Sequence, residues 1–105
     1  GMLMGTLDYM APEQIRSAAE VDHRADVYAL GVVAFQMLTG QLPMKGDNPG
    51  AVMMARLQLD PPNPRGLSPD LPEDACQAIL RALAKDPAER FASAGGFVDG
   101  LFAAE

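Results

Sequence analysis

The sequence has almost none of the residues from which disulfide frameworks and multi-cysteine metal sites are built. Its 105 residues include one cysteine, Cys76, one histidine and no tryptophan. A single thiol cannot form an intrachain disulfide, and it suits a reducing compartment. We therefore expect Cys76 to be a small core residue, and we expect the chain to be cytoplasmic and to contain no metal site.

Basic residues are also scarce. Eight Lys and Arg residues are scattered along the chain against 14 Asp and Glu residues, and the formal net charge is −6. Binding to nucleic acid requires clustered Lys and Arg, so this composition argues against a nucleic acid partner.

Long apolar runs are missing as well. No run approaches the roughly 20 apolar residues that span a bilayer, and the N-terminus lacks the basic and then apolar pattern of a secretory signal. We predict no membrane segment. With 49% hydrophobic and 21% charged residues, the composition is typical of one globular domain. Gly1, directly before Met2, is typical of the residue left when an affinity tag is cleaved.

One helical pattern dominates what is present. Residues 26–39, with the sequence DVYALGVVAFQMLT, carry apolar side chains on every side of a helical wheel, and Gly40 follows as a stop signal. A helix that is apolar all round must be buried on all sides. We predict that this helix forms the centre of an all-α fold.

Shorter helices are predicted around it, one after Pro12, one over residues 51–59, one over residues 72–85 and one over residues 93–104. Proline fits the first helical position, and Ser93 is a good N-cap. Residues 41–50 are predicted to be a loop, and the proline-rich residues 60–66 a connector that is neither helix nor central strand. The residues expected to face inward from the last two helices are Cys76, Ile79, Leu80, Leu83, Ala84, Phe97, Val98, Leu101 and Phe102.

The methionines could suggest a metal or cofactor site, and His23 could suggest a catalytic base, but we favour a structural role for both. Methionines at helical spacing usually fill cores, so we assign core packing to Met37, Met44, Met53 and Met54. His23 lies in a polar cluster before a helix, where a solvated cap is the more common arrangement.

Three short motifs stand in order along the chain. They are GTLDYMAPEQ at residues 5–14, DHRADVYALG at residues 22–31 and ALAKDPAERF at residues 82–91. Together they resemble the serine/threonine protein kinase family, particularly its bacterial members, and the Ala-Pro-Glu element is part of the kinase signature set. The resemblance covers nearly the whole chain. It implies the C-terminal helical subdomain of a kinase fold, with residues 1–105 as a partial kinase domain from the end of the activation segment to the last helix of the helical lobe.

The resemblance also implies roles for individual residues. Residues 5–10 would form the loop that receives the residue after the phosphoacceptor, so substrate-binding roles fall to Gly5, Thr6, Leu7 and Tyr9. In intact relatives the threonine matching Thr6 bridges the catalytic aspartate and a lysine, whereas read locally it is a turn hydroxyl.

Three further residues carry structural roles in the resemblance. Glu13 matches a buried acidic residue whose partner is the arginine matching Arg90, which would join two positions 77 apart in sequence. Asp26 matches the aspartate that accepts hydrogen bonds from the catalytic loop. Read locally, Asp26 is an acidic residue in a first helical turn, stabilised by free N–H groups.

The motifs that perform phosphoryl transfer do not occur in this sequence. They are a glycine-rich loop, a lysine on the nucleotide phosphates, the catalytic-loop aspartate and asparagine, and Asp-Phe-Gly. We predict no catalytic residue and no cofactor in this chain, with ATP and Mg²⁺ binding only in an intact parent.

Three hypotheses follow. The chain is a truncated kinase lobe, inactive by itself, whose parent phosphorylates protein Ser and Thr. Alternatively it is a non-catalytic module that binds a protein partner or itself, or an unrelated small helical bundle. Because the upstream part of a kinase would cover the central helix, the first two lead us to expect an exposed apolar patch and homo-oligomers, with possible exchange of the N-terminal segment.

Overall fold

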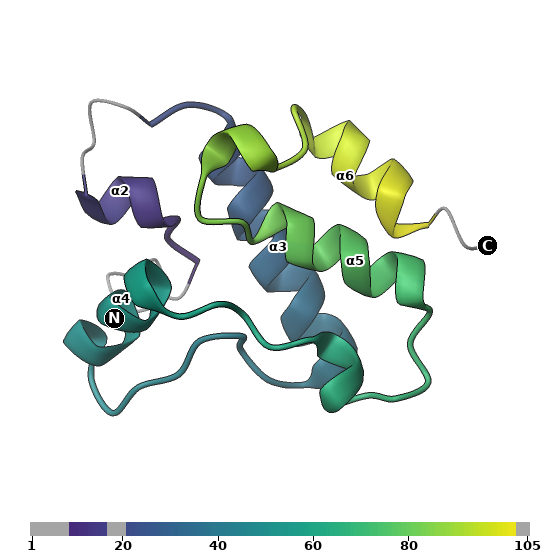
Figure 1. Cartoon of the computed structure of the whole chain (residues 1–105), viewed down its shortest axis with the longest axis horizontal. Coiled ribbons are helices and arrows are strands. Elements are labelled where there is room, and N and C mark those ends of the chain that lie inside the picture. Colours follow the sequence, from purple (N-terminus) through teal and green to yellow (C-terminus); the bar gives the residue numbers. More distant parts are fainter. Residues whose placement is uncertain (1–8, 17–20, 103–105) are drawn as a thin grey trace.

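All regular structure in residues 9–16 and 21–102, the part of the chain that the computed structural model describes, is helical. The α-helices are α2 (Pro12–Arg16), α3 (Arg24–Thr39), α4 (Pro49–Gln58), α5 (Glu73–Ala82) and α6 (Ala94–Leu101), joined in part by the 3₁₀ turns η2 (Pro64–Gly66) and η3 (Pro87–Glu89). The prediction of an all-α fold is confirmed for these residues. Figure 1 shows α3 in the middle, with α2 and α4 on one side of it and α5 and α6 on the other.

The central helix α3 begins two residues earlier than the sequence predicts and ends where it predicts. Its first turn follows His23, whose carbonyl accepts a hydrogen bond from the Asp26 amide at 3.0 Å. At its end Gly40 takes a left-handed backbone with φ of 78°, and its amide donates to the Gln36 carbonyl. Glycine adopts this conformation without the steric penalty of a Cβ, which explains the stop.

The core lies where α3, α5 and α6 pack together. Its fully buried members include Val32 and Phe35 from α3, Ile79 from α5 and Phe97 from α6. Cys76 is also fully buried, as predicted, and burial raises the pKa of its thiol. These contacts fix the relative positions of the central and C-terminal helices.

The shorter helices differ from prediction at their ends. The α4 helix begins at Pro49 rather than at residue 51, because the Asn48 side chain accepts from the Ala51 amide and proline fits the first position. The α5 helix ends at Ala82, short of the predicted Lys85. The Leu83 amide donates to the carbonyls of both Ile79 and Leu80, and the Ala84 amide donates to that of Arg81, three residues back, so the chain tightens after Ala82. The connector 60–66 includes the single turn η2, which the prolines did not suggest.

Several residues predicted to be buried are exposed instead. Val98 in α6 and Phe102 directly after it, both expected to face inward, are 43% and 54% exposed. Among the methionines Met44 is buried and Met53 is half-buried, but Met37 and Met54 are 78% and 50% exposed. The core-packing prediction is therefore wrong for Met37 and Met54.

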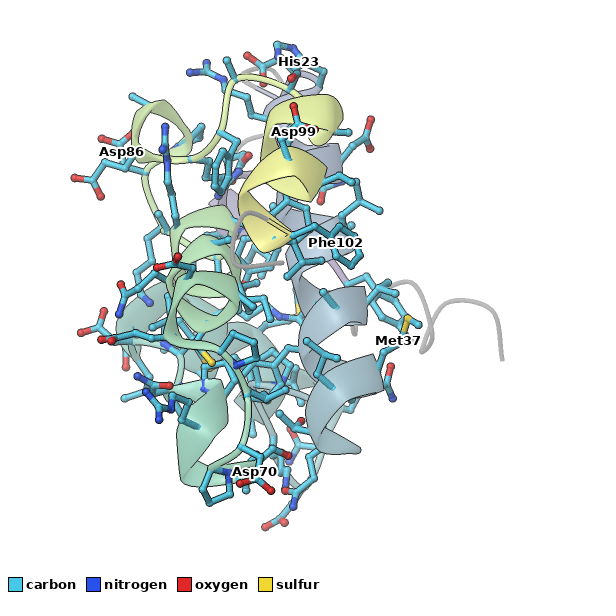
Figure 2. All side chains as sticks on the ribbon, turned by 90° about the vertical axis from the view of Figure 1, so that its right-hand side faces the viewer. His23, Met37, Asp70, Asp86, Asp99 and Phe102 are labelled. Atoms are coloured by element: carbon cyan, nitrogen blue, oxygen red, sulfur yellow. The ribbon has the colours of Figure 1, made fainter. Side chains whose placement is uncertain are left out.

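The central helix is not buried on all sides in this chain. Four large apolar side chains of α3 are exposed, namely Leu30, Val33, Met37 and Leu38. Leu30, Val33 and Met37 are spaced by three and four residues and share one face of the helix, and Leu38, eight residues after Leu30, lies at the edge of that face. We call these four residues the α3 apolar stripe. Figure 2 shows Met37 and Phe102 on the same side of the molecule, and both side chains line one groove.

Candidate functional site

Glu13 and Arg90 form the buried ion pair at the centre of the candidate site. Nη1 of Arg90 donates to one carboxylate oxygen of Glu13 at 2.6 Å, and Nη2 donates to the other at 2.7 Å. Glu13 is 6% exposed and Arg90 is 3% exposed. The paired, charge-assisted geometry is the strong arrangement for an arginine and a carboxylate. The contact expected from the kinase resemblance is present, across 77 positions of sequence.

The same guanidinium joins two other parts of the chain. Its Nε donates to the Ala84 carbonyl at 2.7 Å, its Nη1 donates to the Arg24 carbonyl at 3.0 Å, and its Nη2 donates to the Lys85 carbonyl at 3.4 Å. The guanidinium carbon lies 5.0 Å from the centre of the Tyr28 ring, within the range of a cation–π contact. Arg90 therefore holds α2, the start of α3 and the segment after α5 together.

Local structure delivers Arg90 to this position. The η3 turn begins after Asp86, whose carboxylate accepts a hydrogen bond from the Ala88 amide at 3.0 Å. Proline at the first position of η3 fixes the backbone there. The turn ends at Arg90, which returns to extended backbone. Asp86 and Pro87 of the third motif therefore form the turn that positions Arg90 to contact Glu13.

Tyr9 is the one predicted substrate-binding residue that the structure describes. Its hydroxyl donates to Oε1 of Gln36 in α3 at 2.9 Å, and its side chain packs against the core. Two residues on, the Ala11 amide donates to Oε1 of Gln14 at 2.8 Å. The other predicted substrate-binding residues, Gly5, Thr6 and Leu7, lie outside the described residues.

Asp26 lies beside this segment, in the first turn of α3. It is exposed, and together with Tyr9, Met10 and Gln14 it lines a cleft of about 190 Å³. Asp26 is the acidic residue of this turn, where the helix dipole stabilises negative charge. Asp26 therefore lies beside Tyr9 and Met10, the two residues of the predicted substrate loop that the structure describes.

His23 has a structural contact. It is exposed, and its Nε2 lies 2.6 Å from the Ala92 carbonyl oxygen, so this nitrogen donates. Beside it, Asp22 forms a surface ion pair with Arg24 at 2.8 Å. Hydrogen bonds from Arg24 lower the pKa of Asp22 to about 2.

Gln36 and Arg56 are the residues of this region that sequence reasoning missed. The sequence contains one indication that Gln36 has a special role, because Gln36 is the only amide side chain in the mostly apolar run of residues 26–39. Arg56 is 1% exposed within α4. With Arg90 it counteracts part of the rise in the pKa of Tyr28 that burial causes. Nothing in the pattern of residues 51–59 distinguishes Arg56 from a surface arginine.

Two kinds of feature are absent from the part of the chain that the structure describes. Within residues 9–16 and 21–102, no group of three or more His, Cys, Asp or Glu residues could hold a metal ion. The same part of the chain has no helix that is both long and apolar enough to cross a bilayer.

The all-helical fold and the buried Glu13–Arg90 pair agree with the family to which the sequence comparison assigns this chain. Residues 2–98 match the protein kinase domain family, and the chain belongs to that family. It is 45% identical over 101 residues to the serine/threonine-protein kinase Pkn1 of Myxococcus xanthus, which covers 96% of this chain and 14% of Pkn1. It is also 45% identical over 101 residues to the tyrosine-protein kinase MasK of the same species, covering 96% of this chain and 16% of MasK.

A solved structure gives the same result for the fold. The crystal structure of the Rad53 kinase domain and SCD2 superimposes with a TM-score of 0.72 at 26% identity, and the match covers 93% of this chain and 36% of that one. The chain is thus similar to about a third of the Rad53 structure, and it spans about a seventh of the length of Pkn1 and MasK. The match supports the conclusion that this chain corresponds to a fragment of the helical lobe of a kinase domain.

Proposed function

We propose that this chain is the substrate-side part of the helical lobe of a serine/threonine protein kinase, whose parent activity is ATP-dependent phosphorylation of protein Ser or Thr. The observation that carries the proposal is the buried Glu13–Arg90 pair. It holds the segment that follows the predicted substrate loop against α3 and the C-terminal helices.

The chain's own residues supply binding and positioning in this proposal. Tyr9 belongs to the loop that would receive the residue after the phosphoacceptor, and the cleft beside it contains the exposed carboxylate of Asp26. Glu13 and Arg90 keep the end of that loop in place. Catalysis in this family depends on such positioning together with electrostatic stabilisation of the transferred phosphoryl group.

The proposal includes inactivity of the 105 residues by themselves. Their sequence contains no glycine-rich loop, no catalytic-loop motif and no Asp-Phe-Gly, the groups on which nucleotide and metal binding depend. A thermal-shift titration of the 105-residue chain with Mg-ATP tests this part. We expect no saturable rise in the unfolding temperature, since only a ligand that binds the folded state stabilises it. A saturable rise would show a nucleotide site and would contradict the predicted absence of one.

A chimera tests the parent activity. In it this chain replaces the matching 101 residues of Pkn1, so that the missing catalytic motifs come from a relative. We expect the chimera to transfer the γ-phosphate to a peptide with one serine. A folded chimera that binds Mg-ATP and yet transfers nothing, while unaltered Pkn1 does, would contradict the proposal.

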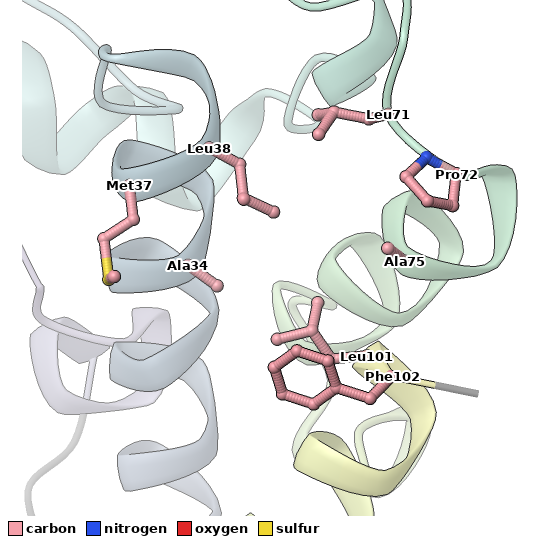
Figure 3. A pocket seen from close by; sticks show the side chains of 8 residues that line it. All are labelled: Ala34, Met37, Leu38, Leu71, Pro72, Ala75, Leu101 and Phe102. Atoms are coloured by element: carbon pink, nitrogen blue, oxygen red, sulfur yellow. The ribbon is translucent and has the colours of Figure 1, made fainter. Parts of the chain in front are cut away.

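A second candidate function is self-association. The α3 apolar stripe borders a groove of about 250 Å³ between α3, the start of α5 and the end of α6, whose lining includes Met37, Leu38, Pro72, Leu101 and Phe102 (Figure 3). Contiguous apolar patches of this kind mark interaction sites on soluble proteins. In this proposal a second copy of the chain covers the stripe, with or without exchange of the N-terminal segment.

A further inference from the structure

Two long apolar side chains stand at the groove between α3, α5 and α6 and also project from it. Met37 is 78% exposed and Phe102 is 54% exposed, and both line the groove of about 250 Å³ (Figure 3). Ala34 on α3 and Ala75 on α5 line it too, and their short side chains leave space between the helices. That space exceeds the roughly 150 Å³ of a cavity that binds a benzene ring. One face of the molecule therefore carries both projecting side chains and a hollow that accepts such side chains.

This face carries no charge in its central part. All eight residues that line the groove are apolar, and α3 has no Asp, Glu, Lys or Arg from residue 27 to residue 39. Two other clefts differ in this respect, because one includes Asp26 and the other, of about 350 Å³, includes Asp60, Lys85 and Glu89. An apolar side chain seated in either cleft would take charged groups out of water, which is costly. Of the three hollows, the groove is the one that matches apolar side chains.

The exposed apolar area on this face is sufficient for contact between two copies. Val98 is 43% exposed one helical turn before Phe102, and the members of the α3 apolar stripe are 38% to 78% exposed. If a fully exposed large side chain offers roughly 150–200 Å², these six residues present roughly 500 Å² in each copy. Two copies would then bury about 1,000 Å², the lower limit for a specific interface. We therefore expect a dissociation constant of about micromolar or weaker.

We propose that the groove is a dimerisation site, in which Met37 and Phe102 of each copy enter the groove of the other copy around a two-fold axis. This inference rests on the self-association proposed above. Because the projecting side chains and the groove lie on one face, a single two-fold rotation fills both grooves and closes the contact at two copies.

Asp26 determines the relative direction of the two α3 helices in this dimer. It is exposed, and it lies seven residues before Val33 and eleven before Met37, which places it on the same side of the helix. Parallel α3 helices would bring the two Asp26 carboxylates together, and like charges in contact are unfavourable. An antiparallel pair keeps them at opposite ends of the contact.

The effect of salt tests the chemistry of the contact. Each copy has a formal net charge of −6, so two copies repel each other at a distance, and added salt screens that repulsion. Sedimentation equilibrium of the 105-residue chain over a wide range of loading concentration measures the dissociation constant. We expect the dissociation constant to fall as sodium chloride is added. A rise would show that ion pairs hold the copies together and would overturn the proposal.

A variant that fills the groove tests the site. Ala34→Leu adds an apolar side chain that occupies the space meant for the partner, and we expect it to weaken dimerisation by about tenfold or more. Gln77→Leu adds the same side chain at an exposed position of α5 outside the groove, and it should leave the dissociation constant unchanged. Circular dichroism confirms that each variant is folded. Stronger association of Ala34→Leu would indicate non-specific apolar adhesion and would overturn the proposal.

A second measurement needs no variant. In a mixture of isotope-labelled and unlabelled chains, a filtered nuclear Overhauser experiment detects only contacts between copies. We expect a signal from the Met37 methyl group of one copy to Leu101 or Phe102 of the other. A dimer without that signal refutes this inference alone, and so does an assembly that grows beyond two copies. A chain that is monomeric at every concentration refutes self-association itself and assigns the groove to another occupant, such as a helix of a longer kinase domain. None of these results bears on the proposed kinase activity, which the chimera tests.

Discussion

Gly31 of α3 and Ala82 of α5 lie so close that a Cβ built on Gly31 would stand 2.9 Å from the Cβ of Ala82. The same Cβ would lie 3.1 Å from a methyl group of Leu83. The two helices therefore approach each other at a point where only a hydrogen atom fits. This contact sets the position of α5, and with it the turn that leads to Arg90.

Substitution of this glycine tests the packing of the lobe. We expect Gly31→Ala to lower the free energy of unfolding by about 1–3 kcal/mol, since overpacking outweighs the better helix propensity of alanine. Urea denaturation followed by circular dichroism measures the change. Gly66→Ala is the matched control because a Cβ there meets nothing within 4 Å. Equal effects of the two substitutions would show that the helices do not meet as described.

The buried ion pair gives a second prediction. Arg90→Met leaves the Glu13 carboxylate buried without its partner, and we expect a loss of about 3–5 kcal/mol in the free energy of unfolding. The double variant Glu13→Gln with Arg90→Met should lose less than the sum of the single losses, because the uncompensated charge is then gone. Denaturation curves of all four proteins measure this.

An exposed pair provides the control for that prediction. Asp22→Asn removes the partner of Arg24 at the surface, and it should shift the urea midpoint little, since solvent screens exposed ion pairs. If Arg90→Met shifts the midpoint no more than Asp22→Asn does, the Glu13–Arg90 contact does not hold the lobe together.

The Asp22 carboxyl gives a prediction about pH. Its pKa is about 2, below the ordinary 3.8, because Arg24 donates hydrogen bonds to the ionised form. A lowered pKa means that its stabilising contribution is fully present above about pH 4 and is lost as the pH falls through about 2. A carboxyl NMR titration measures the pKa directly. In Arg24→Gln the pKa should rise toward 3.8, and a value that stays near 2 would assign the shift to another cause.

The α3 apolar stripe leads to a prediction about assembly. Met37 is 78% exposed on the stripe, and Met54 is 50% exposed on α4. We expect the 105-residue chain to self-associate, and we expect Met37→Lys to reduce that association while Met54→Lys does not, because a buried charge opposes only the contact that covers it. Light scattering after size-exclusion chromatography gives the mass of each. The prediction would be contradicted if the unsubstituted 105-residue chain were monomeric, or if the two substitutions had equal effects on its mass in solution.

Sequence reasoning located the elements well because their signals are local. The apolar run of α3, Gly40 as its stop and Ser93 as the cap of α6, whose hydroxyl accepts from the Gly96 amide, all act within a few residues. The Glu13–Arg90 contact spans 77 positions, and it was expected because the family resemblance supplied it. No local pattern encodes such a distance.

The errors have a common physical cause. Met37, Val98 and Phe102 were predicted to be buried because they are apolar and lie on helices, but burial depends on which element lies opposite each face. The hydrophobic periodicity of one helix does not specify its neighbours. The bond from Tyr9 to Gln36 was missed for the same reason, since a lone amide in an apolar run does not reveal its partner.

The acceptor preference of the Pkn1 chimera is the most direct test of the central proposal. Because relatives of equal identity include a serine/threonine-protein kinase and a tyrosine-protein kinase, the measurement is kcat/KM for three peptides that differ only in a Ser, Thr or Tyr acceptor. Our account predicts transfer to the Ser and Thr peptides, weak transfer to the Tyr peptide and none by the 105-residue chain alone. Preferred transfer to the Tyr peptide, or transfer by the chain alone, would contradict it.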